Sequence, residues 1–217
     1  MIHYDFEQGT QEWLDARKGC ITGSKFSVAR DRLKNGNPSA KATLYARDVA
    51  RERCGGTAEK QFNSYAMKIG REQEAMARNV YELRTGAVTE PVGFFATDDR
   101  MFGLSPDSLI DDDGVLEIKV MVSSDNLFTS AVGGDISEFI DQCEGYLWLL
   151  GRKWVDLVLY APDLVELGLD MVIHRITRNE ERIEKLEADL MAFSLTVRTY
   201  ESALRKAAAA NKEKESA

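Results

Sequence analysis

The sequence has few of the residues on which several kinds of protein chemistry depend. Its 217 residues include three cysteines, two histidines and four prolines. Three widely spaced cysteines form neither a disulfide framework nor a zinc pair, a usage typical of a reducing cytoplasm. His3 and His174 are the only histidines, which excludes a mechanism that needs several of them. Chemistry in this chain must therefore use carboxylates, lysine and, where one binds, a metal.

The sequence also lacks a long hydrophobic run. No apolar stretch approaches the roughly 20 residues of a membrane span, and the first residues do not form a signal peptide. Hydrophobic residues make up 44% and charged residues 29% of the chain, as in ordinary soluble globular proteins. We therefore expect a cytoplasmic protein without membrane association.

The distribution of charge is uneven along the chain. The net charge of −8 argues against a nucleic-acid partner. Residues 1–60, however, hold 11 Lys or Arg against 8 Asp or Glu, whereas the remainder holds 17 against 28. Such a basic N-terminal third suits a protein that meets a polyanion on one surface. An ordinary mixed surface is the alternative, and charge alone does not decide between them.

Hydrophobic periodicity predicts one α/β (α+β) domain with a central mixed sheet flanked by helices. We expect helices over residues 10–18, from about 24, 39–54, 63–85, 123–132, 137–151 and from about 178. We expect strands over 92–96, 101–104, 115–120, 154–160 and 171–176, with a hairpin turn at Asp113-Gly114. The expected domain covers 1–206 (an N-terminal helical region over 1–60, a core over 61–178 and a C-terminal helix over 178–206), with a frayed tail over 207–217.

The segment from Asp107 to Lys119 carries the clearest chemical signal. Glu117 and Lys119 alternate onto one face of the expected strand, about 7 Å apart. If 107–109 forms the partner strand, Asp107 lies about 5 Å from Glu117. Two carboxylates that close repel unless a cation lies between them, and Mg²⁺ prefers oxygen ligands. Lys119 could then hold an attacking water or stabilise phosphate charge. The alternative is a solvent-facing Glu–Lys pair on an edge strand.

Two further helices offer candidate side chains. Glu74, on the 63–85 helix, could supply another carboxylate or be an exposed helix glutamate. Gln142 and Tyr146 are four residues apart and share a helix face. Glu144 points about 200° away from Gln142 at helical spacing, so both cannot face one metal.

These motifs resemble a known family. The spacing of Asp107, Glu117 and Lys119 is that of the PD-(D/E)xK nucleases, and the chain resembles their lambda exonuclease (YqaJ-type viral recombinase) branch. The likeness also covers the Trp13–Ser24 segment, Gly70-x-x-x-Glu74, Ser105-Pro106-Asp107 and the helix through Tyr146 and Trp148. The resemblance implies a restriction-endonuclease-like fold, a ring-shaped homotrimer and a single-strand annealing protein as partner. The implied activity is 5′-to-3′ digestion of linear double-stranded DNA to mononucleotides, with a 3′ overhang left, in the cytoplasm of a phage-infected or prophage-bearing bacterium.

The resemblance also assigns roles to residues. Asp107, Glu117 and the Ile118 carbonyl would bind Mg²⁺, for which Mn²⁺ can substitute. Lys119 would be catalytic, with Glu74 in support.

A second set of residues would grip the 5′-phosphate by the same resemblance: Arg17, Thr22 and Ser24. Ser24 can cap the helix that follows, whose N-terminus favours an anion, and Arg17 offers a fork of donors to phosphate.

One helix departs from the family pattern. Lambda exonuclease has a glutamine where Glu144 aligns, while Gln142 falls two residues earlier. The related RecB-type nucleases show Gln-x-x-x-Tyr, which Gln142 and Tyr146 match. Either Gln142 acts in that way or Glu144 replaces the family glutamine as an acidic catalytic residue, and the sequence leaves both open.

Two other functions compete with the exonuclease. An endonuclease of restriction or repair type would keep the fold but cut closed circular DNA. A non-catalytic DNA-end binding scaffold would instead use the apolar stripe of the C-terminal helix as an interaction surface. The presence of all the acidic and lysine positions of a nuclease favours an enzyme.

Overall fold

The structure, a computed structural model, describes residues 1–57 and 65–215 of the chain; the side chains of 65–68, 70, 71 and 215 are not described. The chain divides into two compact units. Unit 1 comprises Met1–Lys60, Phe94–Leu104 and Glu184–Ala217, and unit 2 comprises Gln61–Gly93 and Ser105–Ile183. Among the described residues, no helix has both the length and the apolar character needed to cross a membrane.

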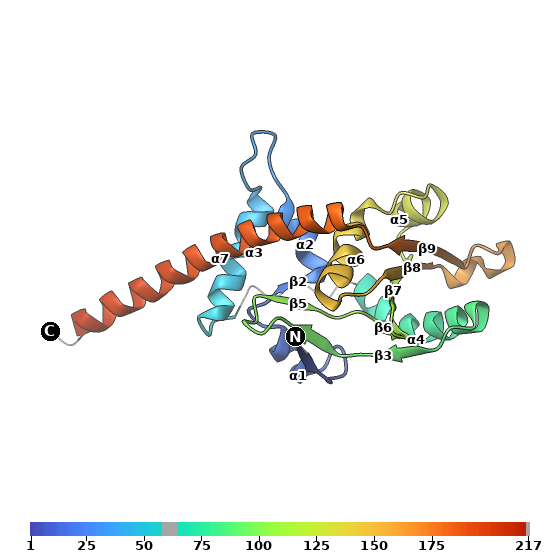
Figure 1. Ribbon diagram of the computed structural model, residues 1–217, viewed down its shortest axis with the longest axis horizontal. Coiled ribbons are helices and arrows are strands. Elements are labelled where there is room, and N and C mark those ends of the chain that lie inside the picture. The colour runs from blue at the N-terminus through green and yellow to red at the C-terminus, as the bar shows by residue number, and fades with distance from the viewer. Residues whose placement is uncertain (58–64, 216–217) are drawn as a thin grey trace. The chain divides into compact units, whose positions relative to one another are not determined.

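Unit 2 is built on a five-stranded mixed sheet (Figure 1). Its strands, in spatial order, are β3 (Thr89–Pro91), β6 (Ser108–Ile110), β7 (Gly114–Val120), β8 (Trp154–Tyr160) and β9 (Met171–Thr177). β7 and β8 are parallel and the other neighbours are antiparallel. The expected hairpin is present, with Ile110 opposite Gly114. β7 is the central strand of the sheet. The Glu117–Lys119 pair therefore does not lie on an edge strand, which excludes that alternative.

Helices cover both faces of this sheet. On one face Leu116 and Ile118 of β7 join a buried cluster with Ala77 and Tyr81 of α4 (Tyr65–Thr85). On the other face α6 (Ser137–Leu150) brings polar side chains to β7, as described below. The remaining helical segments of unit 2 are α5 (Ser124–Asn126), η2 (Leu127–Val132) and η3 (Pro162–Leu167).

Unit 1 has a small sheet of its own, which the sequence did not predict as a separate sheet. Its strands, in spatial order, are β1 (Ile2–Tyr4), β4 (Phe94–Ala96), β5 (Phe102–Leu104) and β2 (Ile21–Thr22). Its helical segments are α1 (Gln11–Arg17), η1 (Gly23–Lys25), α2 (Phe26–Arg30), α3 (Ala40–Arg53) and most of α7 (Glu180–Glu215). The short strands β1 and β3 were also absent from the sequence prediction.

Several helix boundaries follow local chemistry. Thr10 caps α1 and Ser39 caps α3, each accepting a hydrogen bond from a backbone N–H of the first turn, as expected for Ser39. α4 agrees with the expected helix from residue 65, and the expected residues 63 and 64 lie outside the described residues. α7 is helical through Glu215, beyond the expected end at 206, because its alanine-rich stretch strongly favours helix.

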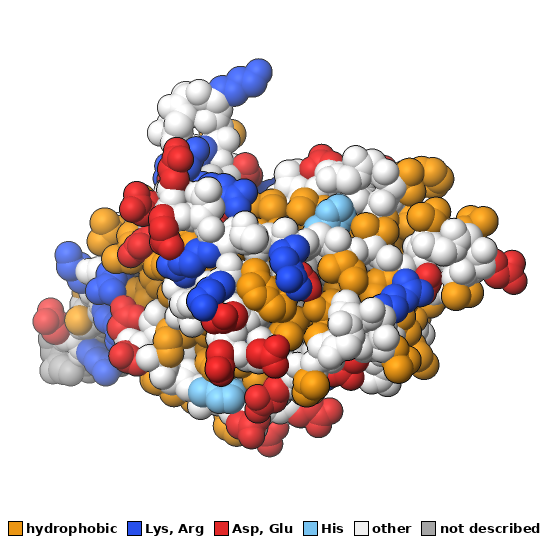
Figure 2. All heavy atoms as spheres, turned by 45° about the vertical axis from the view of Figure 1, so that its right-hand side comes forward, with side chains coloured by type: hydrophobic (Ala, Val, Ile, Leu, Met, Phe, Trp, Pro, Cys, Tyr) orange, Lys and Arg blue, Asp and Glu red, His pale blue; other side chains and the backbone are white. Residues whose placement is uncertain are grey.

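Charges of both signs share the surface. On the face that Figure 2 presents, Lys and Arg side chains lie beside Asp and Glu side chains. Exposed pairs such as Lys153–Asp113, whose Nζ and Oδ2 are 2.8 Å apart, belong to this mixed pattern.

Candidate active site

The candidate acidic residues are brought together by the β6–β7 hairpin. Ser108 of β6 lies opposite Leu116 of β7, so Asp107, directly before β6, falls opposite Glu117. The Oδ2 atom of Asp107 accepts a hydrogen bond of 2.6 Å from the Ile118 N–H. Asp107 therefore lies beside β7 at the position that the hairpin predicted, and its side chain is directed at that strand.

Glu117 is the centre of a buried polar cluster. Only 3% of the residue is exposed. Its Oε1 lies 2.7 Å from the Lys119 Nζ and accepts a 2.7 Å hydrogen bond from the Gln142 Nε2. Its Oε2 accepts a 2.5 Å hydrogen bond from the Tyr146 hydroxyl. Burial of a carboxylate costs free energy unless the group is paired and hydrogen-bonded, and these three partners stabilise Glu117 in its buried position.

Lys119 is held as a cation within the cluster. Its Nζ also donates to the Gln142 Oε1 at 3.2 Å and lies 5.7 Å from the ring centre of Phe139. Burial by itself lowers the pKa of Lys119, but the Glu117 and Asp107 carboxylates outweigh it, so the net pKa is raised. A lysine in this state donates hydrogen bonds and stabilises negative charge.

The pKa of Asp107 is strongly raised. Burial raises its pKa well above the usual value, and the charges of Glu117 and Glu74 raise it further. Glu74, on α4, has a pKa that is itself raised by burial and by Glu117, although Arg78 lies 3.5 Å away and opposes this. Three carboxylates from α4, β7 and the start of β6 are thus within electrostatic reach of one another.

This donor set fits a hard divalent cation. Within residues 1–57 and 65–215, no group of three or more His, Cys, Asp or Glu side chains is arranged as a ready metal site. The oxygen donors are nevertheless of the kind that Mg²⁺ prefers. Burial is the largest cause of the raised pKa of Asp107, and the charges of Glu117 and Glu74 add a repulsion that a divalent cation would relieve.

The structure separates Gln142 from Glu144. Gln142 faces the cluster, where its Nε2 also donates to the Tyr146 hydroxyl at 2.6 Å. Glu144, two residues later on α6, is buried elsewhere and its Oε1 lies 2.8 Å from the Arg182 Nε. Of the two alternatives that the sequence left open, the structure therefore favours Gln142, because helical spacing turns Glu144 away from Glu117.

Tyr146 is the residue of this cluster that sequence reasoning undervalued. An aromatic residue on a helix is most often core, and Tyr146 is indeed 1% exposed. Its hydroxyl nevertheless reaches Glu117, and burial followed by the Glu117 charge raises its pKa well above the usual value. In the sequence, the four-residue spacing between Gln142 and Tyr146 indicated that the two side chains share one helix face.

The candidate phosphate residues all belong to unit 1. The Arg17 guanidinium, at the end of α1, lies over the Trp13 ring with its carbon 4.0 Å from the ring centre. The Thr22 N–H donates to the Tyr45 hydroxyl at 2.9 Å. Burial raises the pKa of Tyr45 to about 12, and the hydrogen bond from Thr22 and the charge of Arg17 oppose the rise. Arg17 and Thr22 therefore share one neighbourhood around Tyr45.

The predicted capping role of Ser24 is not observed. Ser24 is exposed and lies inside η1, and α2 begins at Phe26. The residue at the cap position is Lys25, and its side chain makes no capping hydrogen bond with a described residue. A tight 3₁₀ turn thus delays the helix by two residues and places Ser24 outside the cap position.

The chain is similar to a known protein family over most of its length. The model of the YqaJ-like viral recombinase domain matches residues 12–153. The chain belongs to the YqaJ-like viral recombinase family. No curated protein matches the sequence.

Solved structures extend this likeness over nearly the whole chain. The chain is 31% identical to the alkaline exonuclease LHK-Exo of Laribacter hongkongensis, covering 92% of this chain and 98% of that one with a TM-score of 0.80. LHK-Exo in complex with dAMP matches at 29% identity and a TM-score of 0.81, with the same coverage. A phage-related exonuclease from Haemophilus somnus 129PT shares the fold at 16% identity and a TM-score of 0.68, over 86% of this chain and 96% of that one. The predicted α/β PD-(D/E)xK fold is confirmed.

Proposed function

We propose that this protein is a divalent-metal-dependent exonuclease. It degrades one strand of linear double-stranded DNA in the 5′-to-3′ direction from 5′-phosphorylated ends, releasing mononucleotides and leaving a 3′ overhang. The observation that carries this proposal is the ion pair between Glu117 and Lys119 on the central strand β7, with Asp107 opposite Glu117. Family membership and the likeness to LHK-Exo support the same reaction class.

The proposed roles follow from the contacts around β7. Asp107, Glu117 and the Ile118 carbonyl would hold Mg²⁺, or Mn²⁺ in its place. When bound, the metal supplies a positive charge that polarises a phosphodiester and a nearby water. Lys119, kept protonated by its carboxylate neighbours, stabilises the charge that develops on the phosphate.

Two side chains of α6 position this machinery. Gln142 and Tyr146 each donate a hydrogen bond to a different oxygen of Glu117, so they fix the orientation of its carboxylate. Gln142 also accepts from Lys119, which couples the position of the lysine to that of the glutamate. Glu74 adds a further negative charge near Asp107 and would support the metal site.

The recognition of the substrate end is assigned to unit 1. Arg17 and Thr22, with Ser24 nearby in sequence, would bind the 5′-phosphate through side-chain donors. LHK-Exo has been solved with dAMP, a mononucleotide of the kind that this activity would release. By family likeness we further infer a homotrimer and a single-strand annealing protein as partner in phage-type recombination within a bacterial cytoplasm.

A comparison of linear with closed circular duplex DNA tests the reaction class. Each substrate is incubated with Mg²⁺, with Mn²⁺ or with EDTA. We expect loss of the linear DNA with either metal, no loss in EDTA and an intact circle. Nicking or linearisation of the circle would instead show an endonuclease, and no cleavage with either metal would favour a DNA-end scaffold.

A further inference from the structure

The chain after Arg17 makes a tight turn over residues 17–20. The Cys20 N–H donates to the Arg17 carbonyl at 3.1 Å, which closes a turn over residues 17–20. Lys18 has φ −60° and ψ 127°, and Gly19 has φ +77°. These are the angles of a type II turn, in which the third residue requires positive φ and therefore favours glycine. The turn leads directly into β2, which carries Thr22.

Two consecutive side chains at the end of α3 hold this turn. In a type II turn the backbone N–H of the third residue has no partner inside the turn, and Gly19 is buried. Its N–H donates to the Glu52 Oε2 at 2.9 Å, and its carbonyl accepts from the Arg53 Nη1 at 3.2 Å. Both backbone polar groups of Gly19 are thus satisfied by α3.

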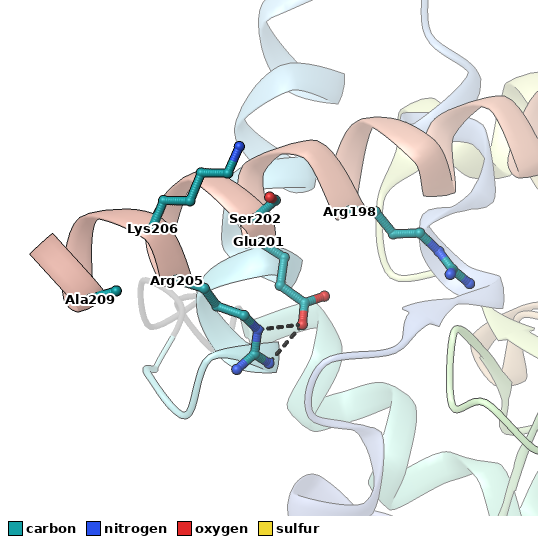
Figure 3. A pocket seen from close by; sticks show the side chains of 6 residues that line it. All are labelled: Arg198, Glu201, Ser202, Arg205, Lys206 and Ala209. Atoms are coloured by element: carbon teal, nitrogen blue, oxygen red, sulfur yellow. Dashed lines mark hydrogen bonds and ion pairs between the residues drawn. The ribbon is translucent and has the colours of Figure 1, made fainter.

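Arg53 connects the turn to the rest of unit 1. Its Nη1 also donates to the Arg100 carbonyl at 3.0 Å, and its Nε donates to the Glu201 Oε2 at 3.0 Å. Glu201 is bound in turn by Arg205, whose Nη2 lies 2.7 Å from the Glu201 Oε1 (Figure 3). An open pocket on α7 is lined by Arg198, Glu201, Ser202, Arg205, Lys206 and Ala209.

The other side of the turn is also anchored. Arg100 has φ +53°, an uncommon angle for a residue other than glycine. Its Nη2 donates to the Ala16 carbonyl at 2.8 Å, immediately before Arg17. The backbone on both sides of Arg17 is therefore fixed by side chains from α3 and from the β4–β5 connection.

We propose that Glu52 and Arg53 are positioning residues that set the preference for a 5′-phosphorylated end by fixing the 17–20 turn. This inference rests on the proposed role of Arg17 as a 5′-phosphate ligand. The turn determines where Arg17, at its first position, stands relative to Thr22 on β2. A guanidinium held in place before the substrate arrives binds phosphate without the cost of ordering the loop.

The test uses two linear duplexes that differ only in a 5′-phosphate or a 5′-hydroxyl. The ratio of their kcat/KM values measures the phosphate preference. Glu52→Ala removes the acceptor for Gly19, whereas Glu52→Gln keeps one. Arg51→Ala, an exposed site on the same helix, is the matched control, and Arg17→Ala shows how much preference the proposed ligand itself provides.

We expect Glu52→Ala to lower the phosphate preference about tenfold, the scale of one lost hydrogen bond to a charged group. The loss should appear in KM for the phosphorylated duplex, with cleavage of the hydroxyl duplex unchanged. Glu52→Gln and Arg51→Ala should keep the wild-type ratio. Arg53→Ala should lower the ratio in the same way, and thermal unfolding will show whether this more connected residue also destabilises the fold.

The outcomes separate the two proposals. If Arg17→Ala lowers the ratio but Glu52→Ala does not, the inference about α3 is wrong and the phosphate site stands. If Glu52→Ala lowers cleavage of both duplexes equally, Glu52 is structural and the inference is also wrong. If the wild type shows no preference, or Arg17→Ala leaves it unchanged, the proposed phosphate site fails and this inference fails with it.

Discussion

At the scale of single residues, the Glu117 carboxylate organises the candidate site. It is buried, and its oxygens contact an ammonium, an amide and a phenol from two elements. Such a network specifies orientation strongly, because each partner is itself held by another member. The half-buried Asp107 and Lys119 complete a site in which charge and geometry are fixed together.

Replacement of Asp107 or Lys119 should lower cleavage strongly while leaving the fold intact. Asp107→Asn keeps an acceptor for the Ile118 N–H but removes the charge, and Lys119→Met keeps the length of the side chain. We expect each to lower the single-turnover cleavage rate by at least about 10²-fold, as for loss of one preorganised charged group. Circular dichroism checks the fold, and near-wild-type cleavage by both variants would show that the active site lies elsewhere.

Gln142 and Glu144 should respond in opposite ways. Gln142→Ala removes the link between Glu117 and Lys119, so cleavage should fall at least about tenfold. Glu144→Gln weakens the pair with Arg182, so it should lower thermal stability and leave cleavage unchanged. Equal losses of cleavage in both variants would contradict the separation that the structure shows.

At this scale, the sequence predicted that Glu117 and Lys119 share one face of a strand with Asp107 nearby, because strand alternation is a local rule, and the structure places them so. It did not decide between Gln142 and Glu144, since helical spacing shows that two residues diverge without showing which faces the sheet. The packing of α6 on β7 supplies that information. The capping role expected of Ser24 is not observed because a 3₁₀ turn precedes α2, and such a turn leaves no mark in the hydrophobic pattern.

At the scale of elements, a buried carboxylate, Asp156, ties α4 to the sheet that carries the site. The Asp156 side chain on β8 accepts a 2.6 Å hydrogen bond from the Tyr81 hydroxyl of α4. Arg175 of β9 donates to both oxygens of Asp156 and lies over the Trp154 ring. Asp156 is 1% exposed, so α4, with Glu74 on it, is anchored by a fully paired carboxylate.

Asp156→Ala should destabilise the protein by about 2 kcal/mol, because it leaves the buried Tyr81 hydroxyl without its hydrogen-bond partner. Urea denaturation followed by fluorescence measures this change. The matched control is Lys153→Ala, which breaks an exposed ion pair directly before β8 and should change stability little. A loss for Asp156→Ala no larger than that of the control would contradict the anchoring role.

The docking of α7 should depend on pH. The hydrogen bond from Arg205, with help from Arg53, outweighs burial and holds the pKa of Glu201 below its usual value. A carboxylate with a lowered pKa in the folded state contributes stability above its unfolded pKa of about 4.3, and this is lost as pH falls through the folded value. Glu201→Gln should therefore lower the thermal unfolding temperature at pH 7, and its difference from wild type should shrink below about pH 4. A difference that is constant from pH 7 to pH 3 would contradict this.

Long elements were predicted well and short ones poorly. β7, β8, β9 and α6 have clear periodicity, so their bounds in the structure agree with the prediction within about two residues. β1 and β3 have three residues each and exist through pairing with β4 and β6, which the local sequence does not encode. The second sheet was missed for the same reason, since its strands come from distant regions of the chain.

At the scale of the whole molecule, the proposed functions are divided between the two units. Arg17 and Thr22 belong to unit 1, whereas Asp107, Glu117 and Lys119 belong to unit 2. Substitutions in unit 1 should therefore change which ends are attacked, and substitutions in unit 2 should change whether any phosphodiester is cut. The basic N-terminal third of the sequence falls within unit 1, in line with a role in binding phosphate.

The most direct test of the central claim is strand-resolved digestion of a single linear duplex. One end carries a 5′-phosphate, the other a 5′-hydroxyl, and each strand has its own 3′ label. With Mg²⁺ present, we predict loss of the 5′-phosphorylated strand from its 5′ end, release of mononucleotides and a surviving complementary strand. Internal fragments, or equal loss of the two strands, would contradict the account.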